Sequence, residues 1–123
     1  MTEQEKIKQM VDLACEALSE KKAADIKVID ISGISTIADY FIITNGENPN
    51  QVHALVDNVD EKLGRAGFTP RSTEGYNAAN WVLMDYGDVI INILTKEMRE
   101  KYNIERVWGD CEIIAELGGE ESL

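Results

Sequence analysis

The chain is 123 residues long and carries 23 Asp and Glu residues against 12 Lys and Arg residues, a formal net charge of −11 at pH 7. Its composition, 44% hydrophobic and 28% charged, is typical of one globular domain and excludes a largely disordered chain. Because nucleic acids are held mainly by Lys and Arg side chains on their phosphates, we expect little direct nucleic-acid binding. The charge favours a basic partner, although solubility alone is the commoner reason for an acidic protein.

Cysteine usage and the N-terminal sequence indicate the compartment. Cys15 and Cys111 lie far apart and form no CxxC pair, which predicts free thiols in a reducing environment. Residues 1–6 lack the basic stretch and apolar run of a secretion signal. No apolar run has the length needed to cross a bilayer. We therefore expect a cytoplasmic protein without membrane contact.

Two helices and two strands are predicted in the first half of the chain. Thr2 and Glu5 form a capping box before an amphipathic stretch. Asn48 as an N-cap, Pro49 at the first helical position and Gly67 after the last one delimit a second apolar-faced helix. Between the helices lie β-branched and unalternating apolar runs that predict strands. The expected elements are a helix at about residues 3–21, strands at 26–31 and 40–44, and a helix at 49–66.

The second half predicts strands followed by a short helix. A turn at Gly87 and Asp88 joins two strands, which is a hairpin signal. From Glu112 onward the chain has four Glu and no Lys or Arg, so we expect residues 112–123 to be a flexible acidic tail after a domain at 1–111. The fold class is α/β (α+β), one domain with a mixed sheet of about five strands layered with helices. The expected elements are strands at 71–74, 81–86 and 89–94 and a helix at 95–102.

Motifs for catalysis are scarce. Phosphate-binding loops and nucleophile elbows are absent from the sequence, and His53 has no second His or Cys near it. Asp39, Asp85 and Asp88 lie near strand ends, as do the metal-binding acids of nucleotidyltransferases. Those enzymes pair two acids, however, and Phe41 stands where the second is needed. We therefore expect no enzymatic activity, no metal and no cofactor, with a metal-dependent nucleotidyltransferase-like enzyme as the alternative.

Aromatic residues cluster in the second half of the chain. Tyr and Trp are enriched in binding hot spots because they bury much area at low rotamer cost. Any one of them fits a core position equally well, but the cluster, with acids between its members, favours a binding face. Five of the six Tyr and Trp residues belong to it: Tyr76, Trp81, Tyr86, Tyr102 and Trp108.

Four segments, with the sequences ADYFII (38–43), EGY (74–76), WVLMDYGDV (81–89) and YNIERVWGD (102–110), resemble the Iojap family of ribosomal silencing factors, RsfS. The resemblance covers about residues 3–110. It implies a fold similar to that of nucleotidyltransferases without their activity. It also implies a translation repressor that binds the large ribosomal subunit through its protein L fourteen. Such a repressor blocks joining of the small subunit when nutrients are scarce, and it forms a homodimer when free.

We expect the ribosome-contacting face on the strand at 81–86. Trp81, Leu83 and Asp85 share one side of this strand and Val82 and Met84 the other, because side chains alternate along a strand. The second pair suits the core better, so a contact by Tyr86, which falls on its side, is the weaker prediction. A self-associating scaffold with another partner is a further alternative. The candidate contact residues are Tyr76, Trp81, Leu83, Asp85, Tyr86 and Asp88.

Overall fold

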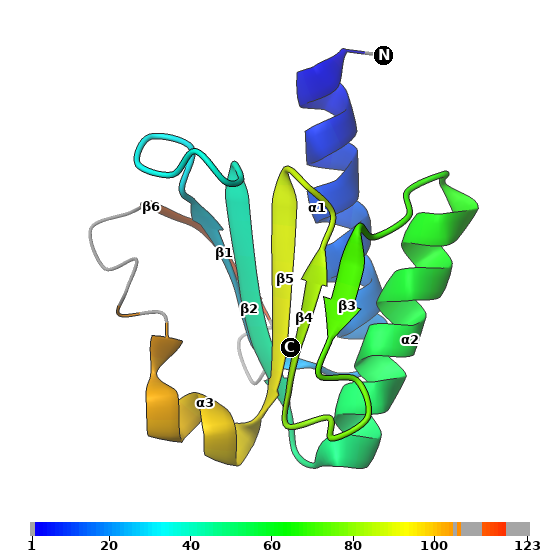
Figure 1. Ribbon diagram of the computed structural model, residues 1–123, viewed down its shortest axis with the longest axis vertical. Helices are drawn as coiled ribbons and strands as arrows, with labels where there is room; N and C mark the ends of the chain where they lie inside the picture. Colours follow the sequence, from blue (N-terminus) through cyan, green and yellow to red (C-terminus); the bar gives the residue numbers. More distant parts are fainter. Residues whose placement is uncertain (1, 105, 107–111, 118–123) are drawn as a thin grey trace.

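The computed structural model describes residues 2–104, 106 and 112–117, which form three helices and one six-stranded mixed sheet (Figure 1). The order of strands across the sheet is β3-β4-β5-β2-β1-β6. This confirms the predicted α+β class and mixed sheet, and all five predicted strands are present. The elements are α1 (Glu3–Glu20), β1 (Ala24–Asp30), β2 (Tyr40–Gly46), α2 (Pro49–Arg65), β3 (Ser72–Glu74), β4 (Trp81–Asp85), β5 (Val89–Thr95), α3 (Lys96–Tyr102) and β6 (Glu112–Leu117).

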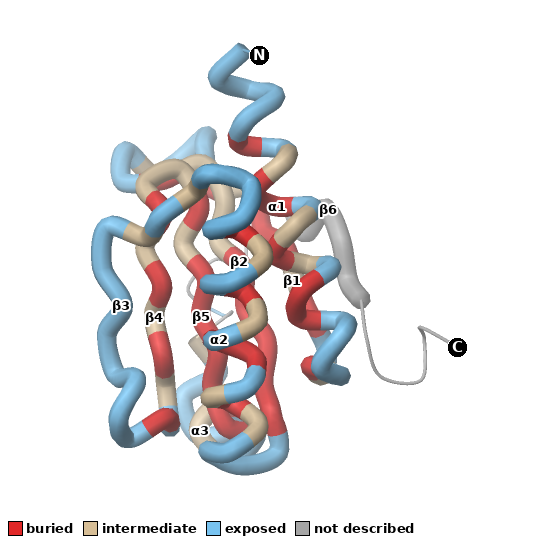
Figure 2. The backbone as a smooth tube through the Cα atoms, turned by 90° about the vertical axis from the view of Figure 1, so that its right-hand side faces the viewer, coloured by how far each residue is buried: buried red, intermediate tan, exposed pale blue. Residues whose placement is uncertain are grey.

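The centre of the sheet is the parallel pair β2 and β5, and every other pairing is antiparallel. Parallel strands buried on both faces are typically continuous apolar runs, and β2 and β5 have that character. In the register, Phe41 lies beside Ile90 and Leu83 lies opposite Asn92. The edge strand β3 is exposed along its length (Figure 2).

Helices α1 and α2 lie side by side on one face of the sheet and form the main core with it (Figures 1 and 2). Their predicted N-terminal signals are confirmed. The Thr2 hydroxyl accepts from the Glu5 amide at 3.1 Å in a capping box, and Asn48 Oδ1 accepts from the Gln51 amide at 2.9 Å. The apolar stripes of both helices are buried against the sheet: Ile7, Met10, Val11, Ala14, Ala17 and Leu18 in α1, and Val52, Leu55, Val56, Val59 and Leu63 in α2.

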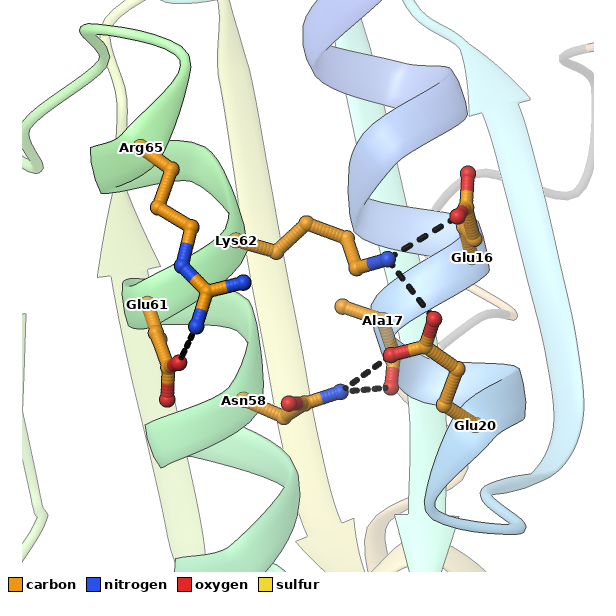
Figure 3. A network of polar contacts seen from close by, with 7 residues as sticks. All are labelled: Glu16, Ala17, Glu20, Asn58, Glu61, Lys62 and Arg65. Atoms are coloured by element: carbon orange, nitrogen blue, oxygen red, sulfur yellow. Dashed lines mark hydrogen bonds and ion pairs between the residues drawn. The ribbon is translucent and has the colours of Figure 1, made fainter.

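Polar contacts join the two helices along their solvent side (Figure 3). Lys62 Nζ lies 2.9 Å from Glu16 Oε1 and 2.7 Å from Glu20 Oε2. The Asn58 amide donates to the Ala17 carbonyl at 2.8 Å and to Glu20 at 3.0 Å. The hydrogen bond from Lys62, followed by that from Asn58, lowers the pKa of Glu20 below its usual value. The acidic partners Glu16 and Glu20 remain largely exposed to solvent, so these ion pairs add only modestly to the packing beneath them.

Helix α3 lies on the opposite face of the sheet and is anchored there by a buried arginine. Arg99 is 6% exposed and donates from Nη1 to the Asp25 carbonyl at 2.7 Å and to Asn45 Oδ1 at 3.1 Å. Its Nη2 lies 3.4 Å from the Asp25 carboxylate. At the other end, the Thr95 hydroxyl accepts from the Met98 amide at 3.3 Å and caps the helix. Arg99 therefore fixes α3 to the ends of β1 and β2.

The expectation of a flexible tail from residue 112 is wrong for its first half. Glu112–Leu117 forms β6 and pairs antiparallel with β1, with Val28 opposite Ala115. The segment EIIAEL includes two β-branched isoleucines, and pairing it satisfies the backbone groups along one edge of β1. Trp108, Cys111 and the tail residues 118–123 lie outside the described residues. No helix in the described part of the chain is long and apolar enough to span a membrane.

Candidate docking surface

Strand β4 separates a core side from a surface side, as its alternation predicts. Val82 and Met84 are fully buried beneath α1 and α2. Trp81, Leu83 and Asp85 point to the other face and are half-buried. The register places Ile90 of β5 opposite Asp85, and Phe41 of β2 beside Ile90, both also half-buried. We call this set the open face: Phe41, Trp81, Leu83, Asp85 and Ile90.

The open face is bordered at one end by α3 and at the other by the loop between β1 and β2. Near α3, the ring centroids of Trp81 and Tyr102 are 5.9 Å apart. Near the loop, Phe41 and Ile90 pack against a small buried cluster of Ile29, Ile31 and Ala38. The same loop leaves Ile34 67% and Ile37 74% exposed. A largely apolar strip thus runs across β4, β5 and β2, from α3 to the loop between β1 and β2.

Trp81 is held in place by a hydrogen bond to its side chain and by the close approach of the preceding loop to its backbone. Its Nε1–H donates to Asn92 Oδ1 at 3.0 Å. The loop before it is tightly turned: Gly75 has φ +83°, and a Cβ there would lie 2.3 Å from the Trp81 carbonyl oxygen. Only glycine fits at that position without a shift in the backbone. The sequence did not single out Asn92, because its contact with Trp81 depends on the register of β4 against β5.

Asp85 forms hydrogen bonds within the β4–β5 hairpin and also contributes to the open face. Its Oδ1 accepts from the Gly87 amide at 2.7 Å, and its backbone carbonyl accepts from the Arg71 amide at 2.6 Å. Gly87 has φ +89°, a left-handed conformation that favours glycine. Asp85 therefore stabilises the turn between β4 and β5 and also places a carboxylate at the edge of the apolar strip.

Tyr86 does not reach the open face, which corrects the weaker of the predictions. It is 7% exposed and packs in the core beneath α1 and α2, on the same side as Met84. Burial, with a smaller contribution from the negative charge of Asp60, raises the pKa of the Tyr86 hydroxyl. Among the described residues this hydroxyl has no hydrogen-bond partner.

Tyr76 lies apart from the open face, against helix α2. Its hydroxyl donates to Asp57 Oδ1 at 2.8 Å, and its ring centroid lies 4.5 Å from that of His53. The Nε2 of His53 donates to the Tyr76 carbonyl at 2.6 Å. The hydrogen bond to Asp57 is the main reason why the pKa of Tyr76 is raised. Since α2 covers the other face of the sheet, Tyr76 fastens the loop before β4 rather than extending the apolar strip.

Asp88 joins the start of β5 to the start of β2. Its backbone carbonyl accepts from the amides of Asp39 at 2.9 Å and Tyr40 at 3.1 Å. This contact makes Asp88 part of the scaffold at the loop end of the sheet. Among the described residues no three His, Cys, Asp or Glu side chains gather as metal ligands would. The structure therefore brings together Trp81, Leu83 and Asp85, and it adds Phe41 and Ile90, which the sequence analysis did not select.

Comparison with known proteins gives one consistent result. The model of the family described as "Ribosomal silencing factor during starvation" matches residues 4–122. The ribosomal silencing factor RsfS of Bacillus subtilis is 38% identical over 104 residues, which cover 85% of this chain and 88% of that protein. The RsfS of Halalkalibacterium halodurans is 37% identical over 111 residues, covering 90% of this chain and 94% of that protein.

The fold is shared with a solved structure. An X-ray structure of a Chromobacterium violaceum protein superimposes with a TM-score of 0.82 at 33% sequence identity. The superposition covers 94% of this chain and 96% of that chain. Sequence and structure thus agree over nearly the whole length, and the resemblance found from sequence motifs is confirmed.

Proposed function

Because this chain belongs to the ribosomal silencing factor family, RsfS, we propose that it represses translation by binding the large ribosomal subunit. The contact is made through ribosomal protein L fourteen, and the bound chain blocks joining of the small subunit when nutrients are scarce. The observation that carries the proposal is the open face, a half-buried apolar strip on a rigid sheet. The family is named for silencing and not for a reaction, which supports a binding protein over an enzyme.

The composition of the open face suits a protein partner. Interface centres are typically rich in aromatic residues and poor in charge, with polar groups at the rim. Trp81, Leu83 and Ile90 provide apolar area, and Asp85 provides a carboxylate beside it. Their positions on neighbouring strands make the surface rigid, so that little conformational entropy is lost when a partner binds.

The charge of the chain supports a basic protein as the partner. A net charge of −11 opposes close contact with bare ribosomal RNA, whose phosphates repel it. A basic ribosomal protein surrounded by RNA presents the complementary sign and speeds encounter with an acidic chain. We therefore place the contact on protein and assign little of it to RNA.

Repression in this proposal is steric. No bond is made or broken, and the bound chain occupies a surface that the small subunit needs. Its effectiveness depends on a residence time that is long compared with encounters between subunits, and the packing of anchors such as Trp81 sets that time. The chain acts in the cytoplasm, with the ribosomes, and forms a homodimer when free. The dimer and the ribosome complex compete if they use the same face.

Co-sedimentation with purified large subunits tests this proposal. The chain is expected to sediment with large subunits and not with small subunits, and its prior addition is expected to reduce formation of joined ribosomes. Serum albumin, which is also acidic, serves as a control for charge alone. A chain that stays in the supernatant, or that binds without reducing subunit joining, would overturn the proposal.

A further inference from the structure

Asn92 is an unusual residue for its position in the sheet. It lies in the middle of β5, is 1% exposed, and has its side chain on the same side of the sheet as Leu83. Its register neighbour on β2 is the fully buried Ile43. Buried polar side chains are normally fully hydrogen-bonded, because an unpaired donor or acceptor loses its hydration without replacement.

Of the two polar atoms in the Asn92 side-chain amide, only the oxygen has a hydrogen-bond partner among the described residues. Its Oδ1 accepts the hydrogen bond from Trp81 Nε1, whereas its Nδ2 has no hydrogen-bond partner among the described residues. An apolar side chain of similar size, beside its register neighbours Leu83 and Ile43, would carry no unpaired donor of its own, but it would leave the indole N–H of the half-buried Trp81 without this acceptor. Asn92 therefore weakens the core at this point, and its hydrogen bond to Trp81 is the feature that an apolar residue cannot supply.

We propose that Asn92 is a positioning residue that fixes the Trp81 indole in the orientation used for docking, an inference that rests on the proposed function. Trp81 is held on two sides, by Asn92 through its ring nitrogen and by Tyr102 of α3 through its ring. Helix α3 is itself anchored by the buried Arg99. The aromatic anchor of the open face is thus oriented before any partner arrives.

A fixed orientation strengthens binding without adding contact area. A side chain that is already immobilised loses little rotamer freedom when a complex forms, and this loss is one of the main costs of association. If the hydrogen bond is removed, the indole samples other orientations and must be ordered on binding. The affinity then falls although Trp81 is still present.

The test replaces Asn92 by Leu and by Asp and measures three quantities. The first is the ¹H–¹⁵N signal of the Trp81 indole and its rate of hydrogen exchange, assigned with a Trp108→Phe variant. The second is the melting temperature, and the third is the affinity for purified large ribosomal subunits. The matched control is Thr44→Val, another buried polar-to-apolar change, in the neighbouring strand β2. The Thr44 hydroxyl donates to the Ala24 carbonyl at 2.6 Å, and the register with Ile93 places Thr44 on the side of the sheet opposite to Trp81.

Asn92→Leu is expected to melt at or above the wild-type temperature, to shift the indole signal and speed its exchange, and to bind about two- to tenfold more weakly. Asn92→Asp keeps an oxygen acceptor at the same place. It is expected to restore the indole signal and most of the affinity, with a lower melting temperature because a carboxyl group is buried. Thr44→Val is expected to leave the indole signal and the affinity unchanged.

Two results would overturn the inference: an unchanged indole signal with unchanged affinity in Asn92→Leu, or a loss of folding in Asn92→Leu that Asn92→Asp shares. The second result would show that Asn92 serves the fold alone. If the wild-type chain itself does not bind large subunits, the proposed function fails. The indole signal and its exchange still decide in that case whether Asn92 holds Trp81.

Discussion

The carboxylate of Asp85 accepts a hydrogen bond from the backbone amide of Gly87 at 2.7 Å, so this acid closes the turn after β4 while it borders the open face. Asn at this position keeps the accepting oxygen and removes only the charge. Asp85→Asn is therefore expected to melt close to the wild-type temperature. Its affinity for large subunits should fall modestly and depend less on salt, because a charge at the rim acts mainly on encounter.

The control for this prediction is Asp60→Asn, which removes an exposed acid from α2, the helix that covers the face of the sheet opposite to the open face. Affinities measured over a range of salt concentrations separate the two variants. An equal salt dependence in Asp85→Asn and Asp60→Asn would show that net charge matters and that the position of Asp85 does not.

The buried hydroxyl of Tyr86 predicts a stabilising substitution. Because this hydroxyl has no described hydrogen-bond partner, Tyr86→Phe removes an unsatisfied polar group and keeps the ring in the core. We expect an equal or higher melting temperature and unchanged affinity for large subunits. Thermal unfolding followed by circular dichroism measures the first. A clear loss of stability would show that the Tyr86 hydroxyl makes a hydrogen bond in solution, and a loss of binding at full stability would return Tyr86 to the contact face.

The contact between α1 and α2 predicts a stability difference that depends on pH. The hydrogen bond from Lys62 lowers the pKa of Glu20 below 4.5, its usual value. A carboxylate whose pKa is lowered by folding contributes stability above its unfolded pKa and loses that contribution as the pH falls through the folded value. Lys62→Met should therefore melt slightly below the wild type at pH 7, and the difference should shrink below about pH 4.

Lys8→Met is the matched control, since the ion pair of Lys8 among the described residues is an exposed one of 3.9 Å with Asp12 within α1. Lys8→Met is expected to change the melting temperature less than Lys62→Met does at pH 7, and to have little effect at pH 3. A difference between Lys62→Met and the wild type that stays constant from pH 7 to pH 3 would show that the ion pairs are not its source.

Cys15 is expected to be a slow nucleophile. Burial, together with the nearby charge of Asp12, raises the pKa of its thiol from 9.0 to about 11. The reactive thiolate is then scarce at neutral pH. In a Cys111→Ser variant, alkylation by iodoacetamide should be slow at pH 8 and should still accelerate as the pH rises past 9. Denatured chain provides the fast reference, and a native rate that levels off near pH 9 would contradict the assignment.

The helices, and the faces of the sheet on which the side chains of β4 lie, could be predicted because both depend on signals in the local sequence. Thr2 with Glu5, and Asn48 with Pro49, mark helix starts by contacts within a few residues. The alternation of Trp81 with Val82 places them on opposite faces whatever the neighbouring strand is.

What escaped prediction depends on contacts across the sheet. The bond between Trp81 and Asn92 requires β4 and β5 to pair in one register, and the place of Phe41 beside Ile90 requires β2 to join β5 in parallel. The local sequence of Glu112–Leu117 predicts an acidic tail, and the segment is a strand in the structure because it pairs with the edge of β1. Nothing in the local sequence specifies these partners.

In the proposed complex, Trp81 anchors this chain to the large ribosomal subunit. The most direct measurement is the affinity of Trp81→Ala for purified large subunits, compared with that of the wild type at a temperature where circular dichroism shows both to be folded. Truncation of an aromatic anchor typically costs about 2 kcal/mol or more, so we expect Trp81→Ala to bind at least about thirtyfold more weakly. A folded Trp81→Ala that binds large subunits as tightly as the wild type would contradict it.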